Sequence, residues 1–118
     1  MSVSVDGFVV PVPKDRLADH RRKARTVATL RIKCGALEDH ECAADDVKTG
    51  TRTSFPRVVT LRPGELAVFS WLVFQSRRRR DVVNRTVLAN PLLAELTPQG
   101  ALRRQTHGMG GFKAIVRL

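Results

Sequence analysis

The spacing of apolar positions predicts a strand followed by a long helix at the start of the chain. Residues 3–10 are rich in β-branched side chains, and Pro11 and Pro13 are expected to close the strand. A polar helix is predicted from Asp15 to Cys34, and Gly35 supplies a natural stop behind it. Its inner face is expected to carry the apolar and long side chains that recur at helical spacing, Leu17, His20, Ala24, Val27 and Arg31.

The middle of the chain predicts two more strands separated by a long connection. Residues 36–44 are interpreted as a strand, and residues 45–62 as irregular, because Gly50, Pro56 and scattered Ser and Thr interrupt any period. Residues 65–75 form a strand that is apolar on both faces, with Leu66, Val68, Leu72 and Phe74 on one and Ala67, Phe69, Trp71 and Val73 on the other. Such a strand must be covered on both sides.

The last third of the chain predicts a second helix and a final strand. Ser76 is suited to cap a helix that begins at Arg77, with an inner side made of Val82, Val83, Thr86 and Val87. Pro91 is expected to break this helix, and residues 92–96 to form a short helical turn. A last strand is expected over residues 112–118, behind two glycines.

This order of strand, helix, strand, strand, helix, strand is typical of the ferredoxin-like α+β fold. Its antiparallel sheet carries both helices on one face and leaves the other bare. A second copy of the same sheet is the simplest cover for the bare face, which predicts a homodimer. We expect one domain over residues 1–118, with Phe69, Trp71 and Val73 in the dimer interface or the core.

Composition restricts the classes of function. The chain has 118 residues and a formal net charge of +10, so it attracts polyanions without needing a specific site. An arginine-rich composition alone gives the same charge, and we favour that interpretation over a nucleic-acid ligand. The apolar runs are too short to cross a bilayer and no secretory leader is visible, which predicts a cytoplasmic protein without a membrane partner.

Metal and thiol chemistry have little support in the sequence. Cys34 and Cys42 form no C-x-x-C pair, and no standard zinc spacing occurs, so no metal or cofactor is expected. Glu38, His40 and Cys42 alternate and therefore share one strand face. With His107 they would give a mixed metal or thiol site, but a solvated strand edge is the favoured interpretation.

Six blocks of sequence together resemble the YbaA-like family of uncharacterised bacterial proteins. They occur in the family's order and cover nearly the whole chain: VDGFVVPVP (5–13), GALE (35–38), TSFPR (53–57), VFSW (68–71), RDVVN (80–84) and GGF (110–112). The resemblance implies a ferredoxin-like, dimeric α/β-barrel fold and no known function. This chain departs from the family's usual aromatic residues at Arg31 and Asp39, from its usual His at Cys34, and from a Met-rich and aromatic stretch around His107.

Two groups of residues are candidates for binding. Asp6, His40, Glu41, Ser54 and Arg57 are the first choice for a small-molecule ligand, with Arg57 able to pair with a carboxylate or phosphate. The alternative for residues 53–57 is a loop that Phe55 and Pro56 hold in place. Arg77 and Arg80 begin a helix whose N–H groups attract anions, and the alternative there is a solvated basic turn.

Three hypotheses for function remain open at this point. The first is a small-molecule enzyme or binding protein, and the second a module that binds RNA without sequence preference. The third is a structural or regulatory dimer without chemistry. The strand at residues 65–75 lacks the aromatic motif of RNA-recognition domains, which disfavours base-specific binding. The sequence does not say whether the protein is an enzyme, nor which ligand it takes.

Overall fold

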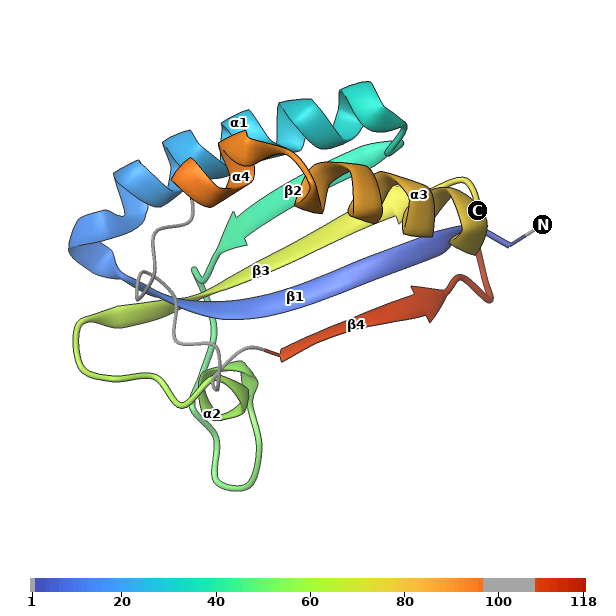
Figure 1. Cartoon of the computed structure of the whole chain (residues 1–118). Helices are drawn as coiled ribbons and strands as arrows, with labels where there is room; N and C mark the ends of the chain where they lie inside the picture. Colours follow the sequence, from blue (N-terminus) through green and yellow to red (C-terminus); the bar gives the residue numbers. More distant parts are fainter. Residues whose placement is uncertain (1, 97–107) are drawn as a thin grey trace.

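The computed structural model describes residues 2–96 and 108–118 (Figure 1). Its elements follow one another as β1 (Ser4–Pro13), the short 3-10 helix η1 (Lys14–Arg16), α1 (Leu17–Cys34), β2 (Glu38–Ala43), α2 (Phe55–Val58), β3 (Glu65–Phe74), α3 (Arg77–Leu88), α4 (Pro91–Leu96) and β4 (Gly108–Lys113). No helix in these described parts is long and apolar enough to cross a membrane.

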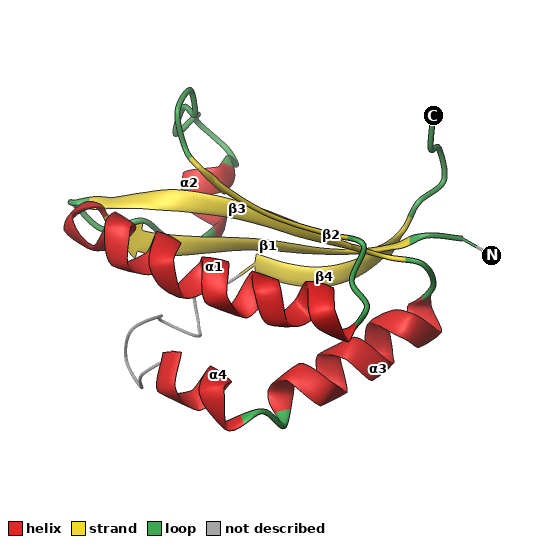
Figure 2. Ribbon diagram, turned by 90° about the horizontal axis from the view of Figure 1, so that it is seen from above, coloured by secondary structure: helices red, strands yellow, loops and turns green. Residues whose placement is uncertain are grey.

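The four strands form one antiparallel sheet in the order β2-β3-β1-β4. Helices α1, α3 and α4 lie together on one face of this sheet, which we call the helix face, while α2 lies on the other side (Figure 2). This arrangement confirms the predicted ferredoxin-like α+β fold, with an open sheet whose second face, the open face, has no long helix over it.

Local signals in the sequence explain where α1 ends and where α3 begins. Gly35 has φ 123°, a conformation that suits glycine, and its N–H closes the last turn of α1 on Arg31 and Ile32. Ser76 precedes α3, and its hydroxyl accepts a hydrogen bond from the Arg79 N–H at 3.2 Å. Both ends lie where the sequence predicts them.

The core lies between the helix face and the helices, and it has two parts. The larger cluster packs α1 and α3 against the ends of β1 and β3 and contains Val27, Ala36, Leu72, Phe74, Val83 and Val87. The smaller cluster packs the start of α1 against the other end of the same strands and contains Val10, Val12 and Val68. The predicted inner side of α3 is therefore half right, since Val82 and Thr86 are exposed.

Two predicted strand limits are wrong, for different reasons. The last strand was predicted over residues 112–118, but it is Gly108–Lys113. Close packing favours the glycines of this strand, and the β-branched Ile115 and Val116 lie outside the sheet. β1 continues through Pro11 and Pro13, which the prediction placed outside it. Pairing with β4 ends at Val9, so the prolines lie where β1 has only β3 beside it among the described strands, and proline is tolerated there.

Candidate functional site

The open face carries a row of aromatic rings. His40 of β2 stacks on Trp71 of β3 with ring centroids 4.3 Å apart, and Phe69 lies next to Trp71 at 5.7 Å. Phe55 of α2 meets Phe69 edge-on at 5.9 Å. Phe69 and Phe55 remain exposed in the single chain, and Val73 of the same face is buried. The predicted dimer or core residues therefore lie on the face that has no long helix over it.

The far edge of the open face is shaped by glycines. A Cβ atom at Gly7 would lie 3.4 Å from the ring of Phe112, and one at Gly110 would lie 3.7 Å from it. The Phe112 ring thus covers the bare backbone of β1 and β4. This ring is itself exposed, so the apolar surface runs from β2 to β4.

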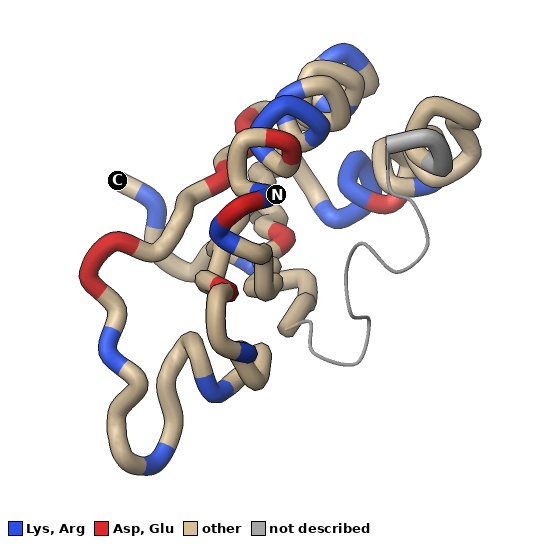
Figure 3. The backbone as a smooth tube through the Cα atoms, turned by 90° about the vertical axis from the view of Figure 1, so that its left-hand side faces the viewer, with Lys and Arg blue, Asp and Glu red and all other residues tan. Residues whose placement is uncertain are grey.

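Positive charge lies mainly on the opposite side of the molecule. The exposed Arg and Lys side chains of α1 and α3 point away from the sheet, and Figure 3 shows these residues along both helices. Among the paired residues of the four strands, the open face carries two formally charged residues, Glu38 and Glu65, and neither is a cation. Stacking rings and phosphate-binding charges are therefore on different faces.

On the helix face, Asp6 of β1 is held by two side chains of α3. The Arg80 Nε donates to Asp6 Oδ1 at 2.7 Å, and the Asn84 Nδ2 donates to Oδ2 at 3.0 Å. The hydrogen bond to Asp6 raises the pKa of the Arg80 guanidinium, which keeps it charged. A Cβ at Gly111 would lie 2.9 Å from Arg80, so glycine in β4 leaves room for this ion pair.

A second buried carboxylate lies in the same row across the sheet. Leu72 of β3 is paired with Asp6 on one side and with Asp39 of β2 on the other. The Asp39 side chain is only 2% exposed, and its Oδ2 accepts a hydrogen bond from the Arg31 Nη1 of α1 at 3.2 Å. Burial raises the pKa of Asp39 although Arg31 opposes this, and Oδ1 has no hydrogen-bond partner among the described residues.

Glu41 and His40 point to opposite faces of β2, so they do not form one site. Glu41 lies on the helix face, where its Oε1 is 3.0 Å from the Nε2 of His20. His40 lies on the open face, together with Glu38 and Cys42 as their alternation predicts. No group of three metal-ligating side chains comes together within residues 2–96 and 108–118, and His107 of the hypothetical mixed site lies outside them.

Ser54 and Arg57 have structural partners in the 45–62 connection. The Ser54 hydroxyl caps α2 by accepting from the Arg57 N–H at 3.3 Å. The Arg57 guanidinium donates through Nε and Nη2 to the carbonyl oxygens of Thr49 and Gly50. These contacts agree with the interpretation that this loop is held in place, and the loop contains a short helix that the sequence analysis did not predict.

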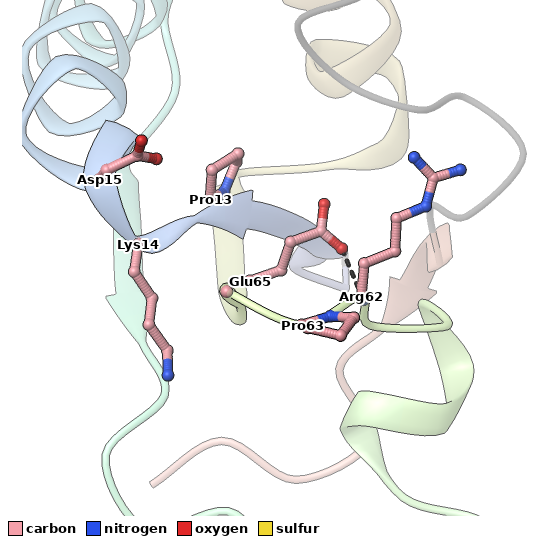
Figure 4. A pocket seen from close by; sticks show the side chains of 7 residues that line it. Pro13, Lys14, Asp15, Arg62, Pro63 and Glu65 are labelled. Carbon is pink, nitrogen blue, oxygen red and sulfur yellow. Dashed lines mark hydrogen bonds between the residues drawn. The ribbon is translucent and has the colours of Figure 1, made fainter.

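A groove of about 640 Å³ lies between this connection and the end of the sheet. It is lined by the charged side chains of Arg57, Lys14 and Asp45 and by apolar side chains that include Leu66 and Ala67. A smaller hollow of about 490 Å³ adjoins it, where residues 13–15 lie next to residues 62–65 at the start of β3 (Figure 4). There the Glu65 Oε1 accepts from the Arg62 N–H at 2.7 Å, which fixes the turn before β3. The two hollows share Lys14 and Glu65.

Most partners of the carboxylates on the helix face were missed at the level of the sequence. Asn84, His20 and the pairing of Arg31 with Asp39 were not predicted. The signal for the last pair is their opposite charge, with Arg31 near the end of the predicted helix and Asp39 in the strand that follows it. Arg77 is exposed at the start of α3, while Arg80 is engaged by Asp6 and Asp81.

Comparison with known proteins identifies relatives of unknown function. The profile of the family described as "Protein of unknown function (DUF1428)" matches residues 4–102. The chain is 36% identical over 112 residues to the uncharacterized protein YbaA of Escherichia coli strain K12, which covers 95% of this chain and 96% of the relative. The YbaA protein of Shigella flexneri matches equally well.

Solved structures share the fold at low sequence identity. One is a dimeric ferredoxin-like protein from an uncultured marine organism, with a TM-score of 0.59 and 8% identity over the full length of both chains. Another is Rv0793 from Mycobacterium tuberculosis, with a TM-score of 0.51 and 18% identity, covering 99% of this chain and 98% of the other. At these identities the likeness concerns the fold alone.

Replacement of Arg80 by alanine tests the link between α3 and β1. The change leaves the buried Asp6 carboxylate without its charged partner, and we expect a loss of roughly 3 kcal/mol in the free energy of unfolding. Arg78→Ala, on the exposed side of the same helix, should stay within about 0.5 kcal/mol of the parent. Urea unfolding of both variants measures this. Equal losses would show that the ion pair contributes little.

The buried Asp39 predicts an unusual dependence of stability on pH. Its pKa is raised in the folded state, so ionising it costs stability as the pH rises above the ordinary value of 3.8. Asp39→Asn removes this cost, and its stability relative to the parent should improve between about pH 4 and pH 7. Asp19, whose pKa its Lys23 and Arg22 partners lower, is the control. Because this pKa is lowered, the Asp19 carboxylate adds stability that is lost only as the pH falls below about 3.8, so Asp19→Asn should run parallel to the parent between pH 4 and pH 7. An Asp39→Asn variant that also runs parallel to the parent over this range would contradict the assignment.

Proposed function

This chain belongs to the family of proteins of unknown function DUF1428, and we propose that it works as a face-to-face homodimer that binds a small organic anion beside the shared sheets. The observation that supports the dimer is the apolar open face. A sheet face of a free-standing antiparallel domain is normally polar, and here its side chains are almost all apolar or aromatic.

Packing two open faces against each other would bury this apolar surface from water. Two sheets stack about 10 Å apart when their inner side chains interdigitate, and aromatic residues supply much of the contact area in such interfaces. Phe69, Phe55 and Phe112 are the exposed rings that a partner would bury. The face spans all four strands, which suits an interface of the standard size of about 1,600 Å². A solved neighbour of the same fold is described as dimeric, which agrees with this proposal.

The groove beside α2 is the best-supported place for the ligand. Its lining contains two cations, Lys14 and Arg57, two carboxylates, Asp45 and Glu65, and apolar side chains that include Leu66 and Ala67. Carboxylates with a short apolar body match this combination, because the charge meets the cations and the body meets Leu66 and Ala67. Arg57 already holds two carbonyl groups, so Lys14 is the more available charge for the ligand.

Binding of nucleic acid is a less supported function. The exposed arginines of α1 and α3 would attract phosphates, and this contact would carry little sequence information. The aromatic rings that could stack on bases lie on the other face of the sheet, where the paired strand residues include no Arg or Lys. The four strands and helices α1 and α3 therefore keep the two features on different faces.

A charge placed on the open face should separate the dimer. Phe69→Glu puts a carboxylate into the proposed interface, while its position is 41% exposed in the single chain, so folding should tolerate it. Val82→Glu on α3, 42% exposed, is the matched control on the helix side. We expect light scattering at micromolar concentration to give two chains for the parent and Val82→Glu, and one chain for Phe69→Glu. A parent with the mass of one chain, 13.1 kDa, would refute the proposal.

Small carboxylates should stabilise the folded protein through Lys14. A ligand at one hundred times its dissociation constant adds about 2.7 kcal/mol to the free energy of unfolding, which a thermal melt detects. We would screen short aliphatic and aromatic carboxylates, and then repeat the melt with Lys14→Ala and with the control Arg21→Ala on exposed α1. The shift should vanish only in Lys14→Ala. A shift that is lost equally in both variants would indicate non-specific charge, and no shift in the parent would reject the groove.

A further inference from the structure

The C-terminal segment after β4 is an exposed apolar arm. Ile115 is 88% exposed and Val116 75%, and the terminal Leu118 is fully exposed. The segment is fastened at its base, because the Ala114 N–H donates to the carbonyl oxygen of Val3 at 3.0 Å. Beyond this bond its three large apolar side chains project into solvent. We call residues 115–118 the arm.

The arm leaves the sheet on the side of the open face. Figure 2 shows the C-terminus and α2 on the same side of the sheet, with α1, α3 and α4 on the other. The arm also continues from Phe112, whose ring lies on the open face over Gly7. Only Lys113 and Ala114 therefore separate the arm from an aromatic side chain of the proposed interface.

The opposite end of the open face presents a complementary surface. There α2 exposes Val58 and Phe55, and Asp45 lines the groove beside them. Asp45 has no ion-pair partner among residues 2–96 and 108–118, and neither has Arg117 of the arm. The apolar side chains of the arm thus have a match in the exposed Phe55 and Val58 of α2, and its cation has a match in Asp45, which lies beside Arg57 in the groove.

We infer that the arm of each copy packs against α2 of the other copy, an inference that rests on the proposed face-to-face dimer. A two-fold axis that runs between the two sheets, perpendicular to the strands, places the arm of one copy over α2 of its partner. The same contact then occurs twice in the dimer. An axis along the strands would instead place the two α2 connections against each other. Each connection has 18 residues, 45–62, and two of them at one end would hold the sheets apart there.

Removing the arm should weaken the dimer without unfolding the chain. A chain ending at Ala114 keeps the bond to Val3 and loses the exposed apolar side chains. We expect its dimer dissociation constant to rise at least about tenfold in sedimentation experiments, since burial of one aliphatic side chain is worth about that factor. An unchanged constant would overturn the arm while leaving the dimer in place. A parent that stays monomeric would instead overturn the proposed function and the arm with it.

A cross-link identifies the surface that the arm contacts. In a background with Cys34→Ala and Cys42→Ser, Val116→Cys combined with Val58→Cys should form an intermolecular disulfide under mild oxidation. The matched control pairs Val116→Cys with Val82→Cys, which is similarly exposed but lies on α3, and it should stay reduced. Cross-linking of Val116→Cys alone would place the two arms together and overturn the contact with α2. Failure of the first pair in a protein that dimerises would overturn it as well.

Discussion

β3 is apolar on both faces, and the burial of these two faces is the constraint on which the packing of the rest of the molecule depends. Leu72 and Phe74 on one face are fully buried by α1 and α3, because a single chain can fold two helices over one side of its sheet. Trp71 and Phe69 on the other face contact each other, His40 of β2 and Phe55 of α2, with no long helix over them. The chain therefore buries one face of β3 with its own helices and leaves aromatic side chains exposed on the other.

Polar groups inside the helix face fix how the helices sit on the sheet. Apolar packing alone tolerates sliding and rotation of a helix, whereas a buried carboxylate accepts few positions for its donors. Asp6 requires Arg80 and Asn84 at one place on α3, and Asp39 requires Arg31 at one place on α1. Because both carboxylates flank Leu72 in one row of the sheet, the two helices are positioned relative to the same point.

The fold was predictable because its signals are local and repeated. Helical spacing in α1, the cap at Ser76 and the long apolar run of β3 each depend on neighbouring residues, and each prediction was confirmed. β4 was misplaced because its glycines are explained only by distant atoms: Gly111 leaves room for Arg80, and Gly108 lies against Val58 of α2. The candidate site residues were less predictable for the same reason. Strand alternation separates His40 from Glu41, but nothing in the sequence near Asp6 indicates that its partners are Arg80 and Asn84.

The position of β1 in the middle of the sheet has a consequence for how the protein is made. β1 leaves the ribosome first, yet its neighbours β3 and β4 and the side chains that neutralise Asp6 all come from the second half of the chain. At a synthesis rate of roughly 5–20 residues per second, the first strand waits several seconds before its partners are available. Contacts between residues that are far apart in sequence also slow folding in general. β1 thus has neither of its two neighbouring strands until more than half of the chain has been made.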